Sequence, residues 1–114
     1  MTLNERVVSR LDEMEMRFEA TLADMANPEV TGDPNQLKDL GILHAELKPV
    51  VDAYRAYRDA ATEMREADEM LGGEQDPDMR EYLTSQRTER EGDLERIAAE
   101  LQVLLVPKDP DDDK

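Results

Sequence analysis

The chain contains no cysteine and no tryptophan, and it has only one phenylalanine and one histidine among its 114 residues. Without cysteine it can form neither a disulfide nor a thiolate metal site, which suits a reducing compartment. The longest apolar run covers only residues 103–106, far too few to cross a bilayer, and the first residues show no basic-then-apolar leader. We therefore expect a cytoplasmic protein without a membrane partner.

Glycine and β-branched residues are also scarce, with only five glycines, and this argues against a β-sheet. Apolar residues make up 39% and charged residues 38% of the chain, compared with about 45–50% and about 25% in ordinary globular domains. This balance fits narrow apolar stripes on long helices. Disorder is the alternative interpretation of such polarity, but the sustained helical spacing of the apolar residues favours helices.

Acidic residues outnumber basic residues, 29 to 14, which gives a net charge of −15 at pH 7. Surfaces that bind nucleic acids are normally basic because they neutralise phosphates. We therefore expect this chain to contact no nucleic acid by itself, whereas a basic protein partner is compatible with its charge.

The most regular apolar pattern lies in residues 33–71, where steps of three and four residues alternate and keep the side chains on one stripe of a helix. Its members are Leu40, Leu43, Leu47, Val50, Tyr54, Tyr57, Ala61, Met64 and Leu71. Only Asp68 interrupts the series. The spacing of about 3.5 residues favours a left-handed supercoil with a partner helix. The pattern predicts one helix of roughly 38 residues, about 57 Å long.

Pro49 is the anomaly within this stretch, because a proline inside a helix removes one backbone hydrogen bond and costs about 3 kcal/mol. The apolar spacing continues through it without a change of phase, so a kinked continuous helix is favoured over two separate helices. Asp33 and Pro34 suit the start of this helix, and Gly72-Gly73 suits its end.

A helix is also predicted before this stretch. It begins with a capping box in Thr2–Glu5, where the threonine side chain accepts from a first-turn amide. It stops near Asn27, because the residue before a proline is pushed out of the helical region, and residues 28–32 form a turn. On this helix, Glu13 and Arg17 are spaced for an ion pair four residues apart, worth about 0.3–0.5 kcal/mol.

A third helix is predicted from Asp76-Pro77 to about Leu105, with its apolar stripe interrupted by Gln86 and Arg90. Three helices with short connections predict an all-α, up-down-up bundle of three long helices with coiled-coil-like packing, followed by an extended acidic C-terminal tail. The expected structural core comprises Leu11, Phe18, Leu40, Leu47, Tyr54, Leu94, Ile97 and Leu101.

Few residues are candidates for chemistry. Asp109, Asp111 and Asp113 occupy the first, third and fifth positions of a calcium-loop pattern, but the required glycine is replaced by Lys114, which favours a solvated acidic tail. His44, the single histidine, supplies neither a metal cluster nor a nucleophile–base pair and is expected beside the apolar stripe. We predict no catalytic residue, no metal site and no cofactor.

Residues 104–114 read Leu-Leu-Val-Pro-Lys-Asp-Pro-Asp-Asp-Asp-Lys, and this segment resembles the junction between the first and second domains of bacterial peptide chain release factor 1. Residues 47–51, Leu-Lys-Pro-Val-Val, together with Tyr54, resemble the second helix of that family, and residues 72–80 resemble the connection that follows it. The release factor 2 paralogue lacks the Pro-Lys-Asp-Pro-Asp-Asp junction, so the resemblance favours the first type.

The resemblance implies that residues 1–106 form the amino-terminal helical domain and that residues 107–114 form the junction to a second domain. It implies a class I release factor that directs translation termination at UAA and UAG codons. The family's codon-reading tripeptide and Gly-Gly-Gln loop do not occur in these 114 residues, so no catalytic residue is carried over.

The resemblance also implies the partners. The family's first domain is a helical arm that approaches the ribosomal stalk-base protein and contacts the class II release-factor GTPase, and the contacting residues cannot be named from this sequence. The competing interpretation is a free-standing helical coiled-coil adaptor or chaperone-like protein, for which the apolar spacing alone would suffice.

Overall fold

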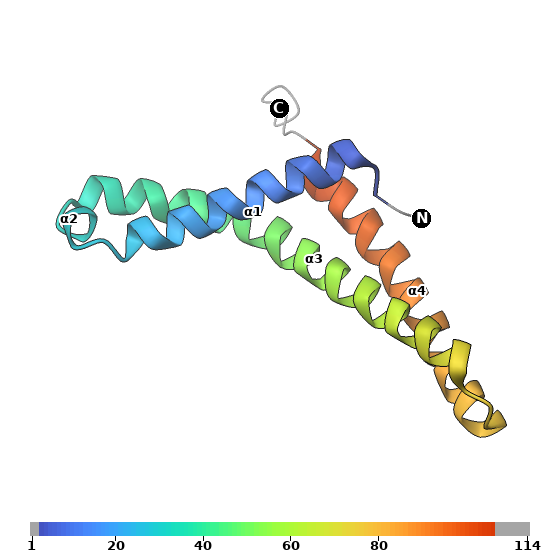
Figure 1. Ribbon diagram of the computed structural model, residues 1–114. Helices are drawn as coiled ribbons and strands as arrows, with labels where there is room; N and C mark the ends of the chain where they lie inside the picture. The colour runs from blue at the N-terminus through green and yellow to red at the C-terminus, as the bar shows by residue number, and fades with distance from the viewer. Residues whose placement is uncertain (1–2, 107–114) are drawn as a thin grey trace. The chain divides into compact units, whose positions relative to one another are not determined.

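A computed structural model describes residues 3–106, which form four helices and no strand. The helices are α1 (Glu5–Met25), α2 (Pro28–Thr31), α3 (Pro34–Gly73) and α4 (Pro77–Leu105) (Figure 1). The prediction of an all-α fold with three long helices is therefore confirmed. The acidic tail beyond residue 106, predicted to be extended, lies outside the described residues.

The starts of α3 and α4 follow from aspartates that precede prolines. The Asp33 carboxylate accepts hydrogen bonds from the amides of Asn35 (3.0 Å) and Gln36 (3.3 Å). The Asp76 carboxylate accepts one from the amide of Asp78 (3.2 Å). Each carboxylate satisfies amides that have no partner within the helix, and the proline that follows is pre-organised for the first helical position.

The first two helices begin differently from the prediction. The side chain of Asn4 caps α1 by accepting from the amide of Val7 at 2.9 Å, while the predicted cap, Thr2, lies outside the described residues. The segment predicted as a turn contains the four-residue helix α2, capped by Asn27, which accepts from the amide of Glu29 at 3.0 Å. Asn27 and Pro28 thus start a helix in the same way as the two Asp-Pro pairs, with a capping side chain followed by a proline in the first turn.

Helix α3 is continuous over 40 residues with Pro49 inside it, as the uninterrupted apolar spacing predicted. It ends at Gly73, although no described glycine has a positive φ. The guanidinium of Arg80, on the next helix, donates to the carbonyl oxygens of Leu71 and Glu74, both at 2.8 Å. A basic side chain therefore donates hydrogen bonds to carbonyl oxygens at the end of α3. In many other helices, a glycine with positive φ lets backbone amides make such bonds.

The helices belong to two compact units, one comprising Leu3–Tyr54 and the other beginning at Arg55. In the first unit, α1 lies antiparallel to the first part of α3 (Figure 1). The later residue of α1, Phe18, packs with the earlier residue of α3, Leu47. The earlier residue of α1, Asp12, accepts a hydrogen bond from the later residue of α3, Tyr54. In the second, α4 lies antiparallel to the last part of α3, as contacts described below show.

The core of the first unit is a cluster of Phe18, Leu47 and Val51, flanked by half-buried Met14 and Leu43. The ring of His44 stacks on Phe18 with centroids 4.7 Å apart, which places the single histidine beside the apolar stripe. The hydroxyl of buried Tyr54 donates to the carboxylate of Asp12 at 2.6 Å and joins the two helices.

On α1, the apolar residue four positions after Phe18 is not buried, although this spacing places both on one side of the helix. Leu22 is 40% exposed, whereas Thr21 is buried. The hydroxyl of Thr21 donates to the carbonyl oxygen of Arg17 at 2.7 Å, and this bond compensates the burial of its polar group.

In the second unit, the buried residues are Tyr57, Ala60 and Ala67 from α3, and Leu83, Leu94, Ile97, Ala98 and Leu101 from α4. The apolar series is interrupted at Asp68, and there the preceding residue, Ala67, is buried instead. Asp68 forms an ion pair at the surface with Arg87. Across both units, every residue expected in the core is buried except Leu40, which is half-buried.

Candidate functional site

The described residues do not bring metal-ligating side chains together. No group of three or more histidine, cysteine, aspartate or glutamate side chains among them is arranged to hold a metal ion. None of the helices within residues 3–106 is long and apolar enough to cross a membrane. The three aspartates of the calcium-loop pattern lie outside the described residues. The described residues form a groove on each unit, and these two grooves are the candidate surfaces for recognition of another molecule.

The first surface, called here the acidic groove, lies between α3 and α4 and has a volume of about 350 Å³. It is lined by Glu63, Glu66, Ala67, Met70, Leu83, Gln86 and Arg90. On α3 the lining residues follow one another at steps of three, one and three positions, and on α4 at steps of three and four, so each helix contributes one face. The groove therefore occupies the part of α4 where Gln86 and Arg90 interrupt the apolar stripe.

The floor and the rim of the acidic groove differ in chemistry. Ala67 and Leu83 are buried, whereas Met70 is 59% exposed and adds an apolar surface at one side. Methionine is unbranched and polarisable, and it adapts to partner surfaces of different shape. The groove thus combines an apolar contact area with carboxylates above it.

Ion pairs neutralise the arginine of this groove. Nη1 of Arg90 lies 3.2 Å from the Glu63 carboxylate and 3.3 Å from that of Asp93, and Nη2 lies 2.9 Å from the Glu89 carboxylate. Glu66 is exposed and has no ion-pair partner among the described residues. The carboxylates around the groove therefore outnumber its one cation, and a basic partner is the complementary one.

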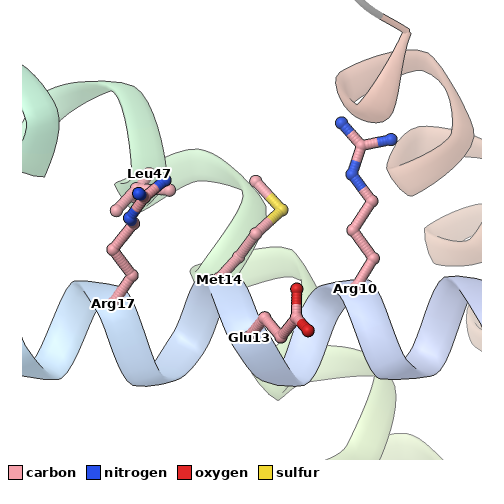
Figure 2. A pocket seen from close by; sticks show the side chains of 5 residues that line it. All are labelled: Arg10, Glu13, Met14, Arg17 and Leu47. Carbon is pink, nitrogen blue, oxygen red and sulfur yellow. The ribbon is translucent and has the colours of Figure 1, made fainter.

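The second surface, called here the arginine groove, lies between α1 and α3 in the Leu3–Tyr54 unit and has a volume of about 450 Å³. Figure 2 shows its lining, which consists of Arg10, Glu13, Met14, Arg17 and Leu47. Leu47 is buried and forms the floor, and Met14 is half-buried. The two arginines are seven residues apart, which on a helix corresponds to about 10.5 Å along the axis.

The charges of the arginine groove are unpaired. Arg10 and Arg17 are both exposed, and neither has an ion-pair partner among the described residues. The expected pair between Glu13 and Arg17 is not formed within this part of the chain. Arginines 87, 90 and 96 of α4, in contrast, are all paired with carboxylates.

Sequence reasoning did not assign any of these groove residues to partner binding. The break at Gln86 and Arg90 was a usable signal, because polar residues at expected core positions often mark a site that an apolar stripe does not fill. The arginine groove gives no such signal, since it requires knowing that α1 lies against the part of α3 that carries Leu47.

Residues 3–106 thus form a highly charged helical module with a groove on each of its two units. By sequence, the chain belongs to the PCRF domain family, whose pattern matches residues 14–114. This match agrees with the resemblance carried by the Pro-Lys-Asp-Pro-Asp-Asp segment.

Individual relatives support the same assignment. The chain is 36% identical over 108 residues to peptide chain release factor 1 of Bacillus licheniformis, 35% to that of Bacillus subtilis and 32% to that of Clostridium beijerinckii. Each alignment covers 95% of this chain and 30% of the relative. The chain thus spans about a third of the length of the curated relatives it matches. No solved structure matches it.

Proposed function

We propose that this chain is the amino-terminal region of a type 1 peptide chain release factor and serves in translation termination as a helical partner-contact arm. The observation that carries the proposal is the family match over residues 14–114, together with the identity to proteins named peptide chain release factor 1. In this proposal residues 1–106 are the arm and residues 107–114 are the junction to a following domain. The whole protein acts in the cytoplasm at UAA and UAG codons.

The arm contacts the ribosomal stalk-base protein, and the acidic groove is the surface that makes the contact. Exposed Glu66 and the surrounding carboxylates attract a basic protein surface, and the apolar area formed by Met70 and Leu83 accommodates an apolar side chain. The net charge of −15 opposes contact with RNA phosphates. The class II release-factor GTPase is the second partner that the family resemblance supports.

The contact is tested by titrating the 114-residue chain against purified stalk-base protein. Glu66→Lys reverses the unpaired charge of the acidic groove, and Glu46→Lys makes the same charge change on an exposed carboxylate of the Leu3–Tyr54 unit. We expect Glu66→Lys to weaken binding by about fivefold or more and Glu46→Lys by less than about twofold, because contact charges dominate over distant ones. Equal weakening by both variants would assign the attraction to net charge and not to the groove.

Salt and RNA provide the second arm of the test. Binding to the stalk-base protein should fade as ionic strength rises, because the screening length falls from about 10 Å at 0.1 M to about 3 Å at 1 M salt. The naked RNA of the stalk base should not bind even at low salt. Tight binding to that RNA alone, or no binding to the stalk-base protein at any salt, would refute the proposed contact.

The chain by itself carries out no chemistry in this proposal. Added to ribosomes that hold formyl-methionyl-tRNA at a stop codon, it should release no peptide above background. Release by the isolated chain would contradict the assignment of a contact role.

A further inference from the structure

The arginine groove is unexpected in a protein with twice as many acidic as basic residues. Glu13 lies between Arg10 and Arg17 in sequence, yet it pairs with neither of them in the described chain. Within residues 3–106 both guanidinium groups are therefore unpaired, and the side chain of Met14 lies between Arg10 and Arg17, while Leu47 of α3 lines the same groove (Figure 2). Two arginines without an ion-pair partner among residues 3–106, together with apolar Met14 and Leu47, form a surface opposite in charge to the acidic groove.

We propose that the arginine groove docks an acidic segment of a partner protein, in which two carboxylates flank one aliphatic side chain. The aliphatic side chain would rest on Met14 and Leu47, and the carboxylates would each accept hydrogen bonds from a guanidinium group. Arginine presents a planar set of donors that matches a carboxylate with two parallel hydrogen bonds. This proposal does not depend on the ribosomal partner proposed above.

The spacing of the two arginines defines the segment. They are seven residues apart on α1, about 10.5 Å along the helix axis. A helical partner segment with carboxylates at the same seven-residue spacing and a leucine midway places all three groups opposite their sites. Such a segment resembles the helix-in-groove mode, in which anchors three, four and seven residues apart share one face.

A protein segment fits this groove better than the other charged occupants do. RNA would bring a continuous row of phosphates past Glu13 and along a unit in which acidic residues exceed basic ones, and it has no aliphatic group for the floor. A second copy of this chain carries a net charge of −15, so two copies repel each other over most of their surfaces. An acidic peptide confines its charge to the two positions that the arginines neutralise.

The experiment uses the 114-residue chain and a labelled synthetic helical peptide with two glutamates seven positions apart and a leucine midway. Fluorescence anisotropy measures the affinity, and amide chemical shifts locate the site. We expect saturable binding with shifts in residues 10–17 and around Leu47, and none around Glu66. The double variant Arg10→Glu/Arg17→Glu should weaken binding by about tenfold or more, since close charge pairs become repulsive.

Three controls separate the groove from general attraction. Arg65→Glu reverses another exposed arginine, which lies in the second unit and has no ion-pair partner among the described residues, and it should weaken binding by less than about twofold. Arg10→Lys/Arg17→Lys keeps the charge but removes the paired donors, and it should give an intermediate affinity. A peptide with lysines in place of the two glutamates should not bind this groove.

Several results would overturn the proposal. One is an equal loss of peptide affinity in Arg65→Glu and in the double variant. A second is unchanged affinity after the leucine of the peptide is replaced by serine. A third is tighter binding of oligouridylate than of the acidic peptide. Absence of saturable peptide binding to the unaltered chain would also overturn it. None of these outcomes bears on binding to stalk-base protein, which is measured separately with Glu66→Lys.

Discussion

Replacing Leu47 with alanine removes a side chain that serves both the core and a groove of the first unit. Leu47 is 6% exposed and packs with Phe18 and Val51. The substitution deletes three carbon atoms without adding a polar group, and alanine is fully compatible with a helix. Loss of packing against α1 is therefore the dominant effect of this change.

The magnitude follows from the transfer of the lost carbons and from the space that they leave. Three carbon groups at about 0.8 kcal/mol each give about 2.4 kcal/mol. A rigid cavity adds about 24 cal/mol per Å³, but Leu47 forms the floor of an open groove that water and neighbouring side chains can fill. We therefore expect a loss of about 2–3.5 kcal/mol, in the lower part of the usual range of about 2–5 kcal/mol.

Urea unfolding followed by far-UV circular dichroism measures this loss, with Ile42→Ala as the matched control. Ile42 lies on the same helix, loses the same three carbons and is 51% exposed. Its substitution should cost less than about 1 kcal/mol, partly because alanine has the higher helix propensity. The packing argument fails if the two variants differ by less than about 1 kcal/mol with unchanged dependence on urea concentration.

Three further predictions concern other positions and use the same unfolding assay. Tyr54→Phe should lower the free energy of unfolding by about 1–2 kcal/mol. A double-mutant cycle with Asp12→Ala should give a coupling energy of at least about 0.5 kcal/mol. Additive losses would argue against the hydrogen bond between the two side chains. Leu101→Ala, at a fully buried position, should lower the free energy of unfolding by about 2–5 kcal/mol. Val103→Ala, at a position 74% exposed, should change it by less than about 0.5 kcal/mol. Similar losses in both variants would show that the buried face of α4 is assigned wrongly. Gly92→Ala should raise stability by about 0.5–1 kcal/mol, since a methyl group there meets nothing within 4 Å and the backbone is helical, and a loss would reveal a contact that the structure lacks.

The helix ends that sequence predicted best are those set by local chemistry. Asp33 and Asp76 each stand before a proline, and the carboxylate and the fixed proline φ together define a start without help from the rest of the fold. The same reasoning applies to Asn27, and its neglect explains why the short helix α2 was taken for a turn. At the first helix, the cap was expected at Thr2, whereas the side chain of Asn4 caps α1, a position that the sequence analysis did not consider.

Which face of a helix is buried depends on the partner helix, and this limited the prediction of the core. The apolar stripe located Leu47 and Ile97 among the buried residues, because their neighbours three and four positions away are apolar too. It did not select Ala67 over its neighbours or Thr21 over Leu22, since a small or hydrogen-bonded residue is buried only where the facing helix approaches closely. The two grooves could not be predicted from the pattern of any single helix, because each groove combines residues from two helices.

The separate cores of the two units have a consequence for the order in which the protein folds during its synthesis. Contacts within each unit join residues that are moderately close in sequence, 42 positions apart for Asp12 and Tyr54 and 19 for Asp68 and Arg87. Chains with such local contacts fold rapidly, within about microseconds to milliseconds, because little loop entropy is lost before contacts form. Translation adds only about 5–20 residues per second. The Leu3–Tyr54 core is therefore complete in sequence before α4 begins at Pro77, and it has time to assemble once it has left the ribosome, while later residues are still being added.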